Sequence, residues 1–221
     1  MKPDDMPQVA RFWNGIAADF DAIYTGANKN RLRRFLDRFF RKDIYQRFDW
    51  VMQRCGDVRG KTICDIGCGS GRFVIEFAKR GAAHVTGVDV APDMLKLAAA
   101  LVESEGVAAQ CDFALSDVLN WRTDRKFDST IAIGFWDYIR NPPERLRLIR
   151  NITNETFLSA WPRYWTWRMP VRKVRLQYIS GCPVYFFRKR RVIQMLEAAG
   201  FAVVACQTIG KLFCVEARPR V

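Results

Sequence analysis

The sequence predicts an α/β fold in which a doubly wound, mostly parallel β-sheet is covered by helices and closed by an antiparallel hairpin. Beyond about residue 60, short apolar runs alternate with helical patterns, as expected for repeated β-α units. The first of these runs leads into a glycine-rich turn, ICDIGCGSGRF, which precedes the first helical pattern. The length of 221 residues is enough for one well-buried domain with appendages.

The expected elements follow this alternation along the chain. Apolar runs predict strands at 62–66, 84–88, 111–115, 127–134 and 156–160. Helical patterns lie between or after them, at 72–80, 92–105, 143–151 and 188–199. Gly200 ends the last helix, and two further strands around Gly210, at 202–208 and 212–217, complete a closing hairpin.

A basic amphipathic helix is expected ahead of this core. Apolar residues recur at spacings of three and four between Leu32 and Val51, and arginines and lysines fill the remaining surface. Such a helix can lie on an anionic membrane, but an apolar stripe more often packs against its own domain, which we favour. We therefore divide the single domain into a helical extension, a cofactor-binding core, an insertion, and a final helix with hairpin, at 1–58, 59–160, 161–187 and 188–221.

The positive charge is concentrated in two segments. The chain carries a net charge of +13. Residues 29–54 hold nine basic and three acidic residues, whereas residues 156–196 hold nine basic residues and no acid. Clustering of this kind predicts an anionic substrate or partner at those segments.

The cysteines and the apolar runs predict the cellular location of the protein. The seven cysteines include no C-x-x-C pair, so we expect neither a disulfide framework nor a metal site. No apolar run approaches the roughly 18 residues of a spanning helix, and the start MKPDDMPQ does not resemble a signal peptide. We expect a cytoplasmic protein, with peripheral contact to an anionic membrane as an alternative.

The glycine-rich turn carries the chemistry. Gly67, Gly69 and Gly71 lie where a strand ends and a helix begins, so a ligand can approach the backbone and the free N–H groups of the helix end. The third glycine follows two residues after the second, so the G-x-G-x-x-G spacing of dinucleotide-binding domains is not met. Asp65, two residues ahead of the first glycine, is a second departure from that pattern.

This combination resembles the class I S-adenosylmethionine-dependent methyltransferases, whose first motif runs acid-x-Gly-x-Gly-x-Gly. The resemblance extends to GVDVAPDML as the second motif, ALSDVL at the third strand, FDSTIAIGFWDYI at the fourth, and FWNGIAADFDAIYTG as the entrance segment. It implies a Rossmann-like sheet of seven strands with an antiparallel last strand. It also implies S-adenosylmethionine as cofactor and methyl transfer as the activity.

The resemblance assigns roles to three acids. Asp65 is expected to interact with the ammonium group of the methionine moiety, and Asp89 with the two ribose hydroxyls. Asp117 matches the acid that binds the adenine amino group, although it could equally cap a short following turn. The remaining cofactor-binding residues that we expect are Tyr24, Gly67, Cys68, Gly69, Ser70, Gly71, Val90, Met94, Val118, Gly134 and Phe135.

Methyl transfer from a sulfonium depends mainly on holding the acceptor atom close and aligned. A base is needed only if the acceptor carries a proton. The candidates for that base are Asp137, Tyr138, Tyr24 and Tyr185. Alternatively, the acceptor is already an anion, such as a carboxylate.

The residues after the fourth strand argue against one class of acceptor. Methyltransferases that act on base or amide nitrogens often carry [DN]-P-P-[YF] there, whereas this chain has GFWDYI. That difference counts against N-methylation of nucleic-acid bases. Phe135 and Trp136 indicate an apolar floor under the acceptor, although Trp136 could equally fill the core.

The stretch AWPRYWTWRMPVRKVR, residues 160–175, mixes aromatic and basic side chains without an acid. Such a mixture suits nucleic acid, a membrane surface or an active-site cover. Because the stretch follows the fifth strand, we expect a lid over the pocket, or a membrane-facing variant of one. Its aromatic residues would wall an apolar acceptor and its arginines would pair with a carboxylate or phosphate: Trp165, Trp167, Arg163, Arg168 and Arg172, with Tyr185 nearby.

We therefore expect methyl transfer to a small, anionic and partly apolar molecule, with O-methylation favoured. The alternatives are an RNA methyltransferase, for which no RNA-binding module is recognisable, and a non-catalytic scaffold with the same fold. Nucleic acid is thus not the partner that we favour, and the sequence predicts no particular oligomeric state.

Overall fold

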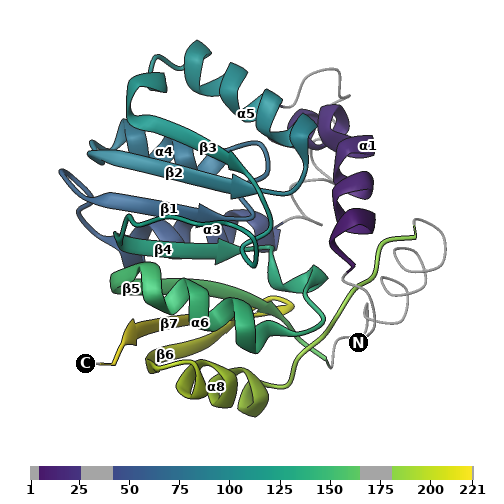
Figure 1. Ribbon diagram of the computed structural model, residues 1–221, viewed down its shortest axis with the longest axis vertical. Coiled ribbons are helices and arrows are strands. Elements are labelled where there is room, and N and C mark those ends of the chain that lie inside the picture. The colour runs from purple at the N-terminus through teal and green to yellow at the C-terminus, as the bar shows by residue number, and fades with distance from the viewer. Residues whose placement is uncertain (1–4, 26–41, 165–180, 221) are drawn as a thin grey trace.

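The computed structural model describes residues 5–25, 42–164 and 181–220, with side chains for all of these except 17–25 and 42–44. One seven-stranded sheet crosses the molecule, in the order β3-β2-β1-β4-β5-β7-β6 (Figure 1). The α/β fold with an antiparallel last strand is therefore confirmed.

The first five strands run parallel to one another, and β7 runs antiparallel to both of its neighbours, β5 and β6. Their bounds are β1 (Thr62–Ile66), β2 (His84–Asp89), β3 (Cys111–Leu115), β4 (Phe127–Ile133), β5 (Thr153–Pro162), β6 (Phe201–Ile209) and β7 (Leu212–Pro219). The fifth strand begins three residues before the expected start and ends two residues beyond the expected end.

The helices between the strands also lie close to the expected positions. They are α4 (Arg72–Lys79), α5 (Pro92–Ser104), α6 (Pro142–Ile152) and α8 (Lys189–Ala198), with short 3-10 turns at η1 (Ala108–Gln110) and η2 (Trp136–Tyr138). Each helix begins and ends within one residue of its expected bounds. Buried side chains of α4 and α5, such as Phe77 and Leu95, belong to one hydrophobic cluster and those of α6 and α8 to another, so helices cover both faces of the sheet.

Two helices precede the core, α1 (Met6–Thr25) and α3 (Lys42–Cys55). Trp50 and Val51 of α3 are buried, and Phe48 stacks on Phe73 of α4 with ring centroids 5.0 Å apart. This part of the amphipathic stripe therefore packs against its own domain, as expected. The earlier part, 32–41, lies outside the described residues. No helix in the described part of the chain is long and apolar enough to cross a membrane.

The strand order places a ligand site. From β1 the chain first adds β2 and β3 on one side of this strand, and then crosses to its other side, where it adds β4 and β5. Ligands of doubly wound sheets bind outside the carboxyl ends of the strands at such a switch point. Figure 1 shows α1 beside these carboxyl ends.

Candidate active site

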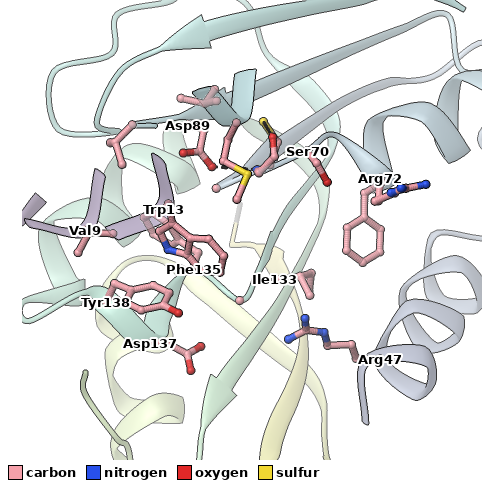
Figure 2. A pocket seen from close by; sticks show the side chains of 18 of the residues that line it. Val9, Trp13, Arg47, Ser70, Arg72, Asp89, Ile133, Phe135, Asp137 and Tyr138 are labelled. Atoms are coloured by element: carbon pink, nitrogen blue, oxygen red, sulfur yellow. Dashed lines mark hydrogen bonds between the residues drawn. The ribbon is translucent and has the colours of Figure 1, made fainter. Parts of the chain in front are cut away.

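A cavity of about 550 Å³ opens at the carboxyl ends of β1, β2 and β4 (Figure 2). Its walls come from the turn after β1, the end of β2, the turn after β4, and the helices α1 and α3. These segments are far apart in sequence and meet only because the sheet reverses its winding direction here. The cavity coincides with the site that the topology predicts.

The glycine loop after β1 forms one wall. The Gly67 N–H donates to the carbonyl of Val88 at 2.7 Å, which ties the loop to the end of β2. Gly67 has φ 74°, and a Cβ on this residue would lie 3.0 Å from Cδ2 of Phe135. Only glycine therefore lets the loop and the turn after β4 approach this closely. A Cβ on Gly69, by contrast, would meet nothing within 4 Å, so this residue faces open space.

Asp89 ends β2 and faces the loop. One carboxylate oxygen accepts a hydrogen bond from the Gly69 N–H at 2.8 Å, and the other accepts one from the Ala91 N–H at 2.9 Å. Burial raises the pKa of the Asp89 carboxyl, and these N–H groups act in the opposite direction. An ionised carboxylate offers about four lone-pair positions, so capacity remains for two hydroxyl donors.

Asp65 lies on β1, one residue before the strand ends and beneath the loop. Its side chain is buried, and Oδ2 has no hydrogen-bond partner among the described residues. Burial, together with the charge of Asp89, raises the pKa of the Asp65 carboxyl well above its usual value. A buried carboxylate oxygen without a partner is costly unless a cation satisfies it.

Comparisons with known proteins agree with this geometry. Residues 63–155 match the family model of a methyltransferase domain. A ubiquinone biosynthesis O-methyltransferase from Aeromonas salmonicida is 31% identical over 106 residues, 48% of this chain and 44% of that protein. The EEF1A lysine methyltransferase 2 of Homo sapiens is 33% identical over 134 residues, 59% of this chain and 56% of that protein. The chain thus matches about half the length of these curated relatives.

A solved structure shares the whole fold. Magnesium protoporphyrin IX methyltransferase from Synechocystis PCC 6803, crystallised with bound SAH, superposes with a TM-score of 0.76 at 19% identity. The superposition covers 99% of this chain and 100% of that one. Residues 63–155 therefore carry a methyltransferase domain, in the fold of the class I S-adenosylmethionine-dependent methyltransferases.

The pocket of this domain fits S-adenosylmethionine, the cofactor of that family. Asp89 retains acceptor capacity for a ribose diol, the space at Gly69 admits a ligand, and the unpartnered oxygen of Asp65 suits an ammonium group. Of the predicted cofactor-binding residues, those that line the cavity are Gly67, Cys68, Gly69, Ser70, Asp89, Val90, Met94, Asp117, Val118, Gly134 and Phe135. Gly71 instead packs on α5, because a Cβ there would lie 3.0 Å from Cβ of Ala98. Asp65 does not line the cavity, so its contact with the ammonium group remains a prediction.

Asp117 makes one contact that the sequence did not indicate, with Arg145, and the capping contact that was expected as an alternative. Its carboxylate forms two hydrogen bonds with the guanidinium of Arg145, at 3.1 and 2.5 Å, and the side chains of both residues are buried. It also accepts the N–H of Leu119 at 3.2 Å, which caps the following turn. Asp117 therefore reaches the pocket as half of an ion pair, and its adenine contact remains a prediction.

Arg47 on α3 is a pocket residue that sequence reasoning missed. A Cβ on Gly134 would lie 3.7 Å from Nη1 of Arg47, so the guanidinium reaches the end of β4. Figure 2 shows this side chain entering the pocket from the side opposite Asp137 and Tyr138. Arg47 forms no ion pair with an acid in the part of the chain that the structure describes. It is placed to bind a carboxylate in the pocket, such as that of an amino-acid moiety.

The entrance segment also contributes through residues other than the expected one. Trp13 on α1 lines the pocket, with its ring 5.7 Å from that of Tyr138 in an edge-to-face contact. The next residue, Asn14, accepts the N–H of Asp93 at 3.0 Å and so fixes α1 to the start of α5. Tyr24 lies in α1, but its side chain is outside the described residues.

The turn η2 supplies the wall opposite the glycine loop. Asp137 and Tyr138 are buried and line the pocket, so two of the four predicted base candidates face it. Trp136, which lies between Phe135 and Asp137 in the sequence, does not line the pocket. It is fully buried and stacks on Trp161 at 4.1 Å, so the floor prediction for Trp136 was wrong and the side chain fills the core.

Two other predicted acceptor-binding residues point elsewhere. The Arg163 guanidinium donates to the carbonyl of Gly210 at 3.0 Å and lies over the ring of Phe213, so it supports the β6–β7 hairpin instead of the pocket. The Tyr185 hydroxyl donates to Asp5 and accepts from Nε of Arg140 at 2.8 Å. Burial and the Asp5 carboxylate raise the pKa of Tyr185, which favours the protonated hydroxyl over the phenolate that a base would need. Four further residues, which were predicted to form the lid and contact the acceptor, lie outside the described residues: Trp165, Trp167, Arg168 and Arg172.

Proposed function

We propose that this protein transfers a methyl group from S-adenosylmethionine to an oxygen atom of a small acceptor that is anionic and partly apolar. The observation that carries the proposal is the glycine loop, hydrogen-bonded to the Asp89 carboxylate beside one pocket at the switch point of the sheet. The name of the Aeromonas relative, an O-methyltransferase, supports oxygen as the acceptor atom.

The walls of the pocket support a partly apolar acceptor. Trp13, Phe135 and Tyr138 present aromatic surface toward its interior (Figure 2). Lys211, just before β7, adds a cation to the lining, and the chain as a whole carries a net charge of +13. Aromatic walls are typical of sites for small molecules. The lining holds acids as well as cations, and it is the cations Arg47 and Lys211 that could pair with an anionic acceptor.

Few steps are required of the protein. When bound, S-adenosylmethionine supplies a methyl group on a sulfonium, which is activated for in-line displacement. The aromatic walls orient the acceptor and exclude water from it. If the acceptor is a hydroxyl, the Asp137 carboxylate can take its proton, with Tyr138 beside it. A carboxylate acceptor needs no base.

A labelled-methyl transfer assay tests this function. The purified chain is incubated with S-adenosylmethionine carrying a labelled methyl group and with metabolite, RNA and protein fractions from the native host. We expect label in the small-molecule fraction, released by mild alkali if the product is an ester. The variant Gly69→Arg, which fills the open space of the loop, serves as the inactive control. Label confined to RNA or to protein would overturn the proposed acceptor class.

A further inference from the structure

Four consecutive basic side chains open helix α8. They are Arg188, Lys189, Arg190 and Arg191, and all four are exposed. Within the described residues none of them pairs with an acid; Arg188 instead lies over the ring of Tyr164, 5.7 Å from its centroid. Four positive charges thus remain uncompensated within one helical turn.

This arrangement does not stabilise the helix. The first turn of a helix carries a partial positive charge and N–H groups without intrahelical partners, so basic residues there are unfavourable. Arg188 at the N-cap position makes no side-chain capping hydrogen bond. A costly cluster that serves neither capping nor ion pairing within the described fold indicates an anionic partner outside it.

The cluster lies at the same edge of the sheet as the pocket. Strand β6 is antiparallel to β7, as β5 is, so β6 is parallel to β5 and the preceding α8 begins at the carboxyl edge (Figure 1). The segment leading into α8 also touches the pocket wall, because the Tyr185 N–H donates to the carbonyl of Asp137 at 2.8 Å. The first cation, Arg188, therefore lies three positions after this wall contact.

We propose that Arg188–Arg191 and Tyr164, the α8 basic surface, dock on the anionic headgroups of a lipid bilayer. Clustered Lys and Arg side chains gain free energy near an anionic leaflet through its negative surface potential. Tyr164 is 40% exposed, and its ring beside Arg188 suits the headgroup region, where tyrosine is enriched.

A bilayer fits this surface better than a nucleic acid does. Non-specific nucleic-acid binding uses a basic groove that follows successive phosphates along a strand, usually with several stacking aromatic residues. Here the cations occupy a single turn at one helix end, beside one exposed ring. Docking would also bring the edge of the pocket to the membrane, into which an apolar acceptor can partition. This argument about the acceptor rests on the proposed function, whereas the docking itself does not.

Vesicle co-sedimentation of the full chain tests the surface. The probes are vesicles of phosphatidylcholine alone and vesicles in which about a third of the lipid is phosphatidylglycerol. We expect binding only to the anionic vesicles, weakened by salt because the charges are exposed. The variant with Arg188, Lys189, Arg190 and Arg191 all replaced by Gln is expected to bind them at least about tenfold more weakly.

A matched control carries the same loss of charge elsewhere. It replaces four other exposed basic residues by Gln: Arg122, Lys126, Arg147 and Arg218. This control is expected to bind anionic vesicles within about twofold of the original chain, since exposed charges farther away than about a Debye length are screened. Equal losses in both variants would show an effect of net charge alone and would overturn the proposal, as would unchanged binding by the α8 variant.

Two further measurements separate the outcomes. Thermal unfolding is expected to show that the α8 variant is at least as stable as the original chain, because unfavourable charges leave a helix N-terminus. Single-stranded RNA is tested on the same proteins, and RNA binding through these four residues that is tighter than vesicle binding at the same salt would overturn the choice of a bilayer. Vesicle binding without methyl transfer would refute only the proposed function.

Discussion

The carboxylate of Asp89 accepts a hydrogen bond from the backbone N–H of Gly69 at 2.8 Å, across 20 positions in the sequence. The residue predicted to hold the ribose therefore also fixes the glycine loop. Its second oxygen accepts the Ala91 N–H, which shapes the start of α5. Removing the side chain would disturb both segments, so a substitution that keeps its shape is the better test.

Asp89→Asn is expected to weaken binding of S-adenosylmethionine at least tenfold. An amide keeps one acceptor oxygen of similar shape but loses the charge, and hydrogen bonds to charged groups contribute about 1.5–3 kcal/mol. Calorimetric titration of ligand-free protein measures the change. Asp93→Asn is the control. Asp93 is an acid with an exposed side chain in the first turn of α5, so its replacement should leave the affinity for S-adenosylmethionine unchanged. Equal affinity for Asp89→Asn would show that another residue binds the ribose.

Asp65→Asn is expected to stabilise the ligand-free protein near neutral pH. Burial raises the pKa of Asp65 in the folded state, so the folded state binds this proton more tightly than the unfolded chain does. The resulting stability is present below the unfolded pKa of about 4 and is lost as pH rises through the folded value. The amide does not ionise, so its advantage in Tm should grow from acid to neutral pH.

The same substitution is expected to weaken binding of S-adenosylmethionine, because the ammonium group loses its countercharge. Opposite effects on stability and affinity would identify Asp65 as a ligand-binding group. A variant that is less stable than the original chain by the same amount at every pH would instead show a purely structural carboxylate.

Local spacing explains why much of this site could be predicted. The loop glycines and Asp89 occupy fixed positions relative to strand ends, and strand ends are readable from apolar runs. Arg47 could not be found this way, since it is one of many basic residues on its segment and only the packing of α3 brings it to Gly134. Trp136 and Arg163 were misassigned because nearness to a strand end does not determine which way a side chain points.

Arg145→Met is expected to destabilise the fold by about 3–5 kcal/mol, because it leaves the buried Asp117 carboxylate without its partner. Chemical denaturation measures this loss. Arg147→Met, at an exposed position of the same helix, should change stability by less than about 0.5 kcal/mol. Combining Arg145→Met with Asp117→Asn should recover part of the loss, since the amide is uncharged. No recovery would show that Arg145 stabilises the fold through other contacts.

Arg47→Met is expected to remove discrimination between S-adenosylmethionine and its decarboxylated analogue. If the guanidinium binds the methionine carboxylate, the original chain should bind the analogue at least about tenfold more weakly, which corresponds to one charge-assisted hydrogen bond. The variant has no such contact to lose, so its two affinities should agree within about twofold. Calorimetry with both ligands gives this ratio directly. Arg54→Met on the same helix is the matched control, because Arg54 pairs with Glu216 instead of lining the pocket, and it should keep the original ratio. If Arg47→Met still prefers S-adenosylmethionine, a different group binds the methionine carboxylate. Arg47 would then be available to contact the acceptor instead.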